Sequence, residues 1–214
     1  WAGEGVYDTI LSAWNAGGVA AATVSVNVVV QPVHAVGAVA GLGGPGMLAA
    51  TPQDALDAVT IPGSKVLLYD GVYAAGGAPA PGMNTTNRMC AAMPVVIEGA
   101  NGPDSVVIDG GGVMRCAWLP AGSALIGVTV SNGVTAATSP DEGDTCGGGV
   151  YCDGDVLVSN CHVIGNTAAT HGGGVCGGRV VASVIISNCA VRGGGVSLAD
   201  VADTDILGNS AAAD

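Results

Sequence analysis

The chain has 214 residues, 37 of them glycine, and 49 % of its residues are hydrophobic while only 10 % are charged. This composition excludes a disordered chain, and glycine without a strict three-residue period excludes collagen. Seventeen acidic residues against five basic ones give a net charge of −12, which excludes the basic surface that nucleic acids require and disfavours anionic membranes.

Residues 1–50 form the first expected segment and consist mainly of alanine, valine and glycine. The apolar run at 24–33 is too short for a membrane-spanning helix and is interrupted by polar residues, so no membrane insertion is expected. Residues 22–33 are typical of one or two strands. The segment is interpreted as a separate cap or as a strand donated to a neighbour. No charged and apolar leader precedes Trp1, so any secretion signal is expected to have been removed or omitted.

The second expected segment, residues 51–214, opens with a short amphipathic helix. Residues 52–59 place apolar side chains on one helical face, Thr51 can cap the first turn, and Pro52 suits that turn. The Pro-Gly pair at 62–63 ends the helix. Short β-rich runs bounded by turn residues then predict strands. The expected strands are residues 65–69, 72–73, 95–98 and 106–109.

A repeated glycine triplet is the strongest feature of the second half. The sequence Gly-Gly-Gly-Val at 147–150 recurs at 172–175 and 193–196, at intervals of 25 and 21 residues. A copy at 110–113 is interpreted as the preceding member of the series. The longer interval after that copy, 37 residues, holds a polar stretch at 135–145 that is expected to form an inserted loop.

Two further markers accompany the triplet. Ser-Asn-Cys at 159–161 recurs at 187–189, with a weaker copy at 131–133. Gly-Asn-Thr-Ala at 165–168 recurs as Gly-Asn-Ser-Ala at 208–211. An interval of 21 to 25 residues accommodates three short strands and three turns and is shorter than the period of helical repeats. We therefore predict a parallel β-solenoid in which like side chains stack and asparagine amides form ladders.

These motifs resemble those of a known family. Residues 52–73, PQDALDAVTIPGSKVLLYDGVY, are similar to the start of pectin-lyase-like right-handed β-helix proteins, in which a short amphipathic helix covers the N-terminal end. Residues 102–112, GPDSVVIDGGG, and the glycine-triplet units at 147–212 are similar to repeat-containing β-helix proteins of bacterial surfaces and to polymorphic outer-membrane-protein repeats. The resemblance spans roughly residues 50–212 and implies an all-β, right-handed parallel β-helix with a short N-terminal capping helix.

A group of acidic residues is the one candidate metal site. Calcium prefers six to eight oxygen ligands, and carboxylates supply them, but the spacing here is not that of an EF-hand. A solvated acidic loop is therefore favoured over a calcium site. The candidate calcium ligands are Asp141, Glu142, Asp144, Asp153 and Asp155.

No catalytic residue is expected from the motifs. The pectin-hydrolysing relatives carry Asn-Thr-Asp and Gly-His-Gly elements, whereas here Ala168 follows Asn-Thr and Thr170 precedes His-Gly, so their catalytic set is not carried over. The basic residues of the second half are expected to be isolated surface arginines: Arg115, Arg179 and Arg192. The histidines have no partner at ligand spacing and are expected to be solvated: His34, His162 and His171.

Seven cysteines leave at least one unpaired, and the absence of a Cys-x-x-Cys pair disfavours a zinc ribbon. Cys161 and Cys189 are expected to occupy the same place in successive coils, either as a buried thiol column or as a cross-coil disulfide. Cys152 and Cys176 keep a looser register. A catalytic thiol is not expected without a paired histidine.

The sequence therefore predicts an extracellular or cell-surface module that is structural or adhesive and not an enzyme. The chain shows no polar cap after its last repeat, so the solenoid is expected either to continue or to stack head-to-tail into a filament. The expected partners are a second copy of the chain or a glycan, without nucleic acid. The alternative is a carbohydrate-active β-helix protein: a polysaccharide lyase, a glycoside hydrolase or a glycan-binding module.

Overall fold

The computed structural model describes residues 5–15, 18–28, 33–37, 48–136 and 138–212. The chain divides into two compact units, Trp1–Pro32 and Val33–Asp214. In the first unit, β1 (Gly5–Asn15) pairs antiparallel with β2 (Gly18–Val28) to form a two-stranded sheet. The second unit begins earlier than the boundary at residue 50 expected from the sequence.

The start of the second unit combines two short strands with a helix. β3 (Val33–Val36) pairs in parallel with both β4 (Leu48–Ala49) and β5 (Ser64–Leu68). The helix α1 (Pro52–Asp57) packs against these three strands and β8. As predicted, Thr51 caps it: the Thr51 hydroxyl accepts from the Asp54 backbone N–H at 3.2 Å, and the Asp54 carboxylate accepts from the Thr51 N–H at 2.9 Å.

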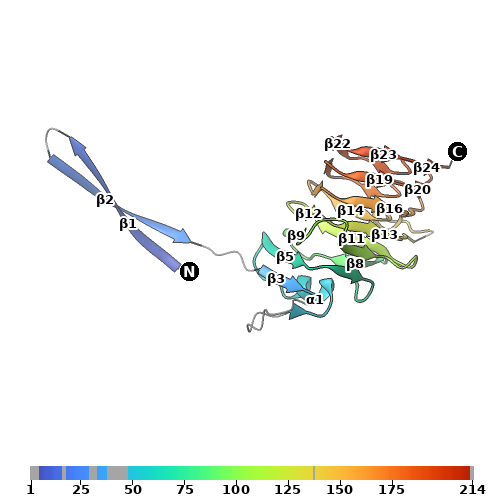
Figure 1. The fold of residues 1–214 in the computed structure, drawn as a ribbon, viewed down its shortest axis with the longest axis horizontal. Helices are drawn as coiled ribbons and strands as arrows, with labels where there is room; N and C mark the ends of the chain where they lie inside the picture. Colours follow the sequence, from blue (N-terminus) through green and yellow to red (C-terminus); the bar gives the residue numbers. More distant parts are fainter. Residues whose placement is uncertain (1–4, 16–17, 29–32, 38–47, 137, 213–214) are drawn as a thin grey trace. The chain divides into compact units, whose positions relative to one another are not determined.

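The rest of the second unit consists of three sheets that the chain visits in turn (Figure 1). Sheet 1 continues from β5 through β9 (Val95–Gly99), β12 (Ala124–Ile126), β15 (Leu157–Ser159), β18 (Arg179–Val181) and β22 (Asp200–Ala202). Sheet 2 contains β6 (Gly71–Tyr73), β10 (Val106–Asp109), β13 (Thr129–Ser131), β16 (His162–Ile164), β19 (Val184–Ile186) and β23 (Asp205–Leu207). Sheet 3 contains β7 (Ala78–Pro79), β8 (Thr86–Cys90), β11 (Arg115–Pro120), β14 (Val150–Asp153), β17 (Val175–Cys176) and β21 (Val196–Ser197).

We call three consecutive strands, one from each sheet, a rung. Neighbouring strands within the three sheets are parallel, except that β7 pairs antiparallel with β8. A further parallel pair is β20 (Cys189–Ala190) with β24 (Ser210–Ala211), and the second helix is α2 (Glu142–Thr145). The described part of the chain is thus all-β with mostly parallel sheets and few helices, an arrangement consistent with a β-helix. The four strands predicted between residues 65 and 109 are confirmed as β5, β6, β9 and β10.

The core consists of side chains that pair in register from rung to rung. Because successive side chains of a strand point to opposite faces, alternate residues face inward, and one inward residue of each strand meets its equivalent in the next rung to form a central column. In sheet 1 this column is Val66, Ile97, Leu125, Val158 and Val180, all fully buried. In sheet 2 it is Tyr73, Ile108, Val130, Val163 and Ile185, and in sheet 3 Met89, Ala117, Val150 and Val175.

The glycine triplets confirm the repeat for three of the four copies. The Gly147 N–H donates to the His171 carbonyl at 2.9 Å and the Gly172 N–H to the Arg192 carbonyl at 3.0 Å, so the last three copies stack. The prediction that the copy at 110–113 is the preceding member of this series is wrong, because the Gly110 N–H instead donates to the Ser131 carbonyl at 2.9 Å. This triplet lies at the corner after β10, whereas the partner of Val150 in the preceding rung is Ala117.

The Ser-Asn-Cys markers also occupy different corners, contrary to the sequence-based expectation. Asn160 lies between β15 and β16, whereas Asn188 lies between β19 and β20. Each corner needs one residue with a positive φ, and this residue is Asn160 (φ 50°) in one triplet but Ser187 (φ 58°) in the other. Cys161 and Cys189 therefore do not stack on each other, and all seven cysteines are free.

The predicted amide ladder consists of Asn166 and Asn209 from the two Gly-Asn markers and, between them, Asn188 from a Ser-Asn-Cys marker. The Asn166 Nδ2 donates to Asn188 Oδ1 at 2.9 Å, and the Asn188 Nδ2 donates to Asn209 Oδ1 at 2.9 Å. The ladder begins at Gly133, whose N–H donates to Asn166 Oδ1 at 2.8 Å. Asn166 and Asn188 are fully buried, so the ladder satisfies polar groups that would otherwise be costly inside the core.

Candidate functional site

The predicted inserted loop lies between β13 and β14 and carries α2 (Glu142–Thr145). Arg115 on β11 fixes this loop through hydrogen bonds. The Arg115 side chain is fully buried, and its guanidinium donates to the carbonyls of Gly147 at 3.0 Å and Cys146 at 2.8 Å, and to that of Gly143. It also lies over the Tyr151 ring, 5.2 Å from the centroid. Burial lowers the pKa of Arg115 to about 10, which leaves it charged at neutral pH.

This position corrects the prediction that Arg115 is an isolated surface arginine. Arg179 is exposed, as predicted. The Arg115 side chain also donates to Asn87 Oδ1 at 2.9 Å, so it joins the loop to strands of two rungs. Sequence reasoning missed this role because the acceptors are backbone carbonyls, which leave no trace in the residue types.

Asp144 fixes the same loop through a second set of hydrogen bonds. Its fully buried carboxylate accepts from the backbone N–H groups of Asn84 at 2.9 Å and Thr85 at 2.8 Å, and from the Ser139 hydroxyl at 2.8 Å. Burial alone would raise the pKa of Asp144, but these hydrogen bonds to its charged form lower the pKa to about 2. The carboxylate is therefore occupied by protein donors.

The five candidate calcium ligands are spread over separate positions. Asp141 caps α2 by accepting from the Gly143 N–H at 2.9 Å. Asp153 and Asp155 are exposed around the turn after β14. Within the described residues, the one group of three ligand-bearing side chains whose ligand atoms all lie within 4.8 Å of one another is Glu142, Cys146 and His171. The structure thus brings only Glu142, of the five carboxylates, into such a group.

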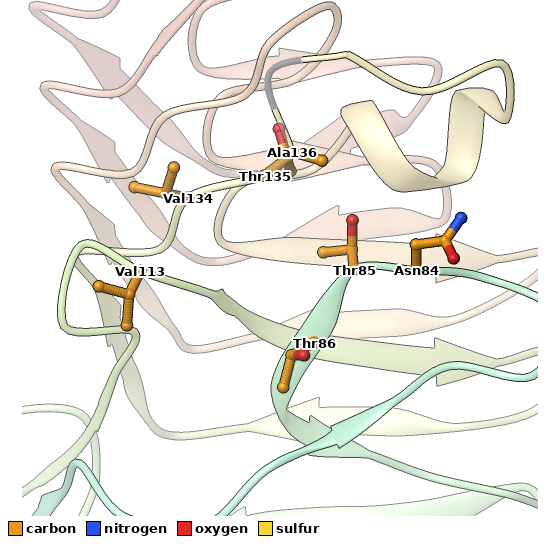
Figure 2. Close-up of a pocket in the computed structure, with 7 residues that line it drawn as sticks. All are labelled: Asn84, Thr85, Thr86, Val113, Val134, Thr135 and Ala136. Atoms are coloured by element: carbon orange, nitrogen blue, oxygen red, sulfur yellow. The ribbon is translucent and has the colours of Figure 1, made fainter.

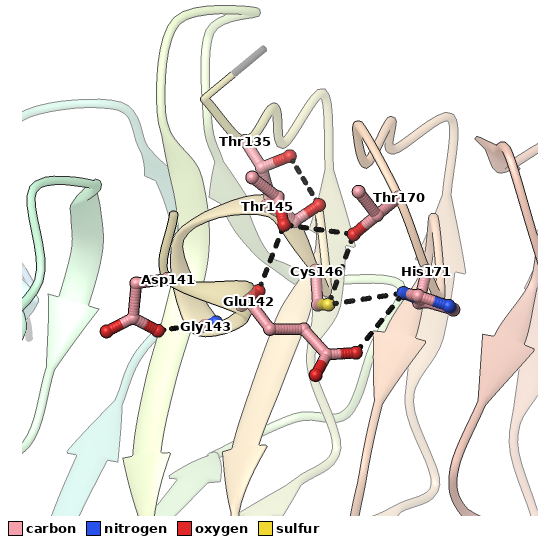
Figure 3. Close-up of polar contacts among 8 residues, drawn as sticks. All are labelled: Thr135, Asp141, Glu142, Gly143, Thr145, Cys146, Thr170 and His171. Carbon is pink, nitrogen blue, oxygen red and sulfur yellow. Dashed lines mark hydrogen bonds and ion pairs between the residues drawn. The ribbon is translucent and has the colours of Figure 1, made fainter. Parts of the chain in front are cut away.

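Glu142, Cys146 and His171 form the candidate site (Figure 3). The Cys146 Sγ lies 3.7 Å from His171 Nδ1, and Glu142 Oε1 lies 3.4 Å from the same nitrogen. Cys146 is buried, His171 is partly exposed, and Glu142 is exposed. The expectation that His171 is solvated and without a partner was wrong.

The stacking of rungs positions these side chains. Cys146 directly precedes one glycine triplet and His171 directly precedes the next, so they occupy equivalent corners of successive rungs. Glu142 comes from the start of α2, and the Cys146 N–H bonds to its carbonyl at 3.1 Å. The interval between Cys146 and His171 is 25 residues, the same as that between their triplets. The signal was thus present in the repeat, one position before each triplet.

Hydroxyl groups surround the thiol. The Thr170 Oγ1 lies 3.3 Å from the Cys146 Sγ and 3.0 Å from the Thr145 Oγ1. Cys176 is a second nearby thiol. Its pKa is raised to about 12, mainly by burial and to a smaller extent by the neighbouring Cys146. Cys176 therefore stays protonated at neutral pH. A thiol, an imidazole and a carboxylate at these distances can either activate the sulfur as a nucleophile or bind a metal ion.

A small pocket lies beside the same loop (Figure 2), and one of its lining residues, Thr135, donates to the Thr145 carbonyl at 3.0 Å. Its volume is about 230 Å³, below the range of roughly 300–1,000 Å³ that is usual for small-molecule sites. The lining residues are Asn84, Thr85, Thr86, Val113, Val134, Thr135 and Ala136, none of which carries a titratable side chain. The pocket therefore offers hydroxyl and amide groups for hydrogen bonding but no acid or base.

Comparison with protein-family models, with curated proteins and with solved structures finds no match to this chain. The structure itself defines the class as an all-β protein with mostly parallel sheets, in which a carboxylate and a thiol of an inserted loop meet an imidazole from the next rung. Among the described residues, no helix is both long enough and apolar enough to cross a membrane.

Proposed function

We propose that residues 33–214 form a right-handed parallel β-helix of the pectin-lyase-like kind, with α1 as its N-terminal cap. The order of the strands supports this proposal, because each of the three sheets takes one strand per rung and neighbouring rungs pair in parallel. The position of α1 also supports it, since Ala55 and Leu56 are buried in the same apolar cluster as Val66 of the first rung. The handedness follows the resemblance of the motifs.

The proposed function is that of a structural or adhesive module outside the cell or at its surface. The observation that carries this proposal is the Asn166–Asn188–Asn209 ladder within an in-register core. The repeated side chains contact the next rung, so the repeat is devoted to length and stiffness. The net charge of −12 favours solubility at a surface exposed to water.

The proposal includes head-to-tail assembly with a second copy of the chain. The last described residues of the core columns in sheets 1 and 2 are Val201 and Ile206, which are 41 % and 46 % exposed. Either a second copy or further rungs of a longer chain would cover them, and the proposal takes the first. Strands β22 and β23 have a paired neighbour on one side only within the described chain. A head-to-tail contact, in which the last rung of one copy meets the α1 end of the next, brings fewer acidic residues together than a tail-to-tail one, because α1 exposes only Asp54 and Asp57 whereas the last rung exposes three acidic residues in each copy. These residues are Asp200, Asp203 and Asp205.

Light scattering after size exclusion and negative-stain electron microscopy test this assembly. Filaments that lengthen with protein concentration are expected. Ile206→Lys should abolish them by placing a charge in the contact, whereas Val113→Lys, at a 75 % exposed position in the turn after β10, should leave them intact. Dispersed monomers at high concentration would overturn the assembly, and closed dimers would overturn its head-to-tail form.

The alternative function is that of a carbohydrate-active or glycan-binding protein, and the hydroxyl-lined pocket favours it. Incubation with a panel of plant and microbial polysaccharides, followed by measurement of released reducing or unsaturated ends, distinguishes the two. The structural proposal expects no product. It fails if product forms and Asp141→Ala abolishes it, with α2 retained in hydrogen exchange. Asp144→Ala is a poorer probe, because removing the carboxylate leaves the backbone N–H groups of Asn84 and Thr85 without their acceptor and would disturb the fold of the loop.

A further inference from the structure

We propose that Glu142, Cys146 and His171 bind a zinc ion that clamps the inserted loop to the next rung. Thiolate sulfur, imidazole nitrogen and carboxylate oxygen are the three ligand types of protein zinc sites. Calcium, which prefers oxygen alone, does not suit this set. The inference is independent of the proposed structural function, because it depends only on this side-chain group.

The distances match a tetrahedral zinc site. With Zn–S of about 2.3 Å and Zn–N and Zn–O of about 2.1 Å, a tetrahedron has S···N and N···O edges of about 3.6 Å and about 3.4 Å. The corresponding distances are 3.7 Å between Cys146 Sγ and His171 Nδ1, and 3.4 Å between His171 Nδ1 and Glu142 Oε1. The ligand atoms are therefore already placed within about 0.1 Å of what zinc needs along two edges.

The same geometry disfavours a catalytic triad. In a triad the base accepts the nucleophile's proton at one ring nitrogen, while the carboxylate holds the other nitrogen. Here the Cys146 Sγ and Glu142 Oε1 both face Nδ1 of His171 (Figure 3). One nitrogen cannot perform both tasks, whereas three ligand atoms that lie within 4.8 Å of one another can share one metal ion.

The surroundings complete the site. The Thr170 hydroxyl, 3.3 Å from the Cys146 Sγ, can donate to a thiolate and thereby orient it. The exposed side of Glu142 leaves room for a water molecule as fourth ligand. Zinc would join α2 to the corner before β17, a contact that otherwise depends on the Thr145–Thr170 hydroxyl pair and the Thr170 N–H bond to the Thr145 carbonyl at 3.1 Å.

Titration of the reduced, metal-free chain with cobalt(II) tests the proposal, because cobalt(II) takes zinc's place and is visible spectroscopically. One equivalent of cobalt should produce a thiolate-to-cobalt charge-transfer band and the strong visible bands of tetrahedral coordination. One equivalent of zinc should then remove both. Calcium in excess should leave them unchanged. Zinc should also raise the thermal unfolding midpoint, because an ion that binds only the folded state stabilises it.

Variants assign the bands to the three residues. Cys146→Ser should abolish the charge-transfer band, and His171→Ala and Glu142→Gln should weaken cobalt binding. The matched controls are Cys189→Ser, a partly exposed thiol at another corner, and His162→Ala, a partly exposed imidazole beside Asp104. Both controls should bind cobalt as the unaltered chain does. The proposal is overturned if no thiolate band forms, or if the band persists in Cys146→Ser.

A measurement on the unaltered chain covers the case in which the Cys146 or His171 variants do not fold. Cys146 is fully buried, so the reaction is run in urea below the unfolding transition, where local opening exposes this thiol. Zinc should slow the alkylation of Cys146 by iodoacetamide there, read by peptide mass spectrometry, and leave the labelling of Cys189 unchanged. The exposed Glu142→Gln variant keeps the thiol and should lose this protection. Equal labelling of Cys146 with and without zinc would contradict the site.

Discussion

Asn188 shows at the residue scale how this fold satisfies buried polar groups. Its Nδ2 donates to the Val163 carbonyl and to Asn209 Oδ1, and its Oδ1 accepts from the N–H and Nδ2 of Asn166. Both donors and both acceptor positions of the amide are thus used inside the core. The amide of Asn188 forms hydrogen bonds to both neighbouring rungs at once, and a hydrophobic residue of equal size cannot replace these bonds.

Replacing Asn188 by alanine should therefore cost roughly 2–4 kcal/mol of unfolding free energy, because it strands at least two buried partner groups. Urea unfolding followed by circular dichroism measures this loss. The control is Asn101→Ala, which removes an exposed hydrogen bond to Asp70 at 2.8 Å and should cost within about 0.5 kcal/mol. Similar losses in the two variants would contradict the importance of the ladder.

The buried thiols make a second prediction at this scale. Burial raises the pKa of Cys116 to about 12 and that of Cys161 to about 11, from an ordinary value of 9.0. Because the fold disfavours their ionisation, the stability they contribute is complete below pH 9 and is lost as the pH rises towards 11 to 12. Each thiol should remove about 1 kcal/mol of stability between about pH 8 and pH 10.

Urea unfolding at these two pH values measures the effect in the unaltered chain and in Cys116→Ala. The variant should lose less stability on going to alkaline pH, by about 1 kcal/mol. Val130→Ala is the control, because it removes a fully buried apolar side chain without a titrating group. It should lower stability equally at both pH values. An unchanged pH dependence in Cys116→Ala would exclude this thiol as a cause.

At the element scale, the inserted loop is joined to the sheets by side-chain bonds rather than by strand pairing. Replacing Arg115 by methionine keeps the apolar stem but leaves the carbonyls of Gly143, Cys146 and Gly147 without their donor. Hydrogen exchange should therefore increase around α2, while β12 and β15 retain their protection. Arg179→Met, at an exposed position, should change neither region. Uniform loss of protection would instead mean that Arg115 supports the whole unit.

Elements could be predicted from the sequence where the signal is local. Short β-rich runs bounded by turn residues located β5, β9 and β10, and Thr51 with Pro52 located the start of α1. Register could not be predicted as well, because different corners use the same residue type: Asn132 and Asn160 both have a positive φ, but one follows a strand of sheet 2 and the other a strand of sheet 1. For this reason Gly110 was matched to the wrong triplet, and the triplets around Asn160 and Asn188 were aligned although they occupy different corners.

The candidate site depends on the register of two triplets that was predicted correctly, and it was missed because residue types alone do not show that the positions before the triplets face each other. Cys146 and His171 become neighbours only once the two glycine triplets are stacked, and Glu142 joins them only because α2 folds back over the corner. Asp144 was predicted as a metal ligand from its type alone, but its carboxylate bonds to backbone N–H groups of Asn84 and Thr85. Residue types thus indicated that this loop carries candidate ligands. The backbone fold determines that Asp144 is occupied by N–H donors and that Glu142 lies near Cys146 and His171.

At the scale of the whole molecule, charge opposes the proposed assembly and exposed apolar area favours it. Leu198 and Leu207 add to the apolar surface near the last rung, being 74 % and 56 % exposed, while Asp200, Asp203 and Asp205 surround it with negative charge on a chain of net charge −12. Salt screens the charges over about 10 Å at 0.1 M and about 3 Å at 1 M, but it does not weaken apolar contacts.

Assembly should therefore increase as sodium chloride is raised from about 0.05 M to about 0.5 M, because repulsion between acidic copies is screened first. Light scattering at fixed protein concentration measures it. Replacing Asp203 and Asp205 by asparagine should shift the onset of assembly to lower salt, because it removes charge from one side of the contact while keeping the shape. Replacing Asp153, the last residue of β14, and Asp155, in the turn that follows, by asparagine removes the same charge away from the end and is the control. If both pairs shift the onset equally, net charge governs the association and the last rung has no special part in it.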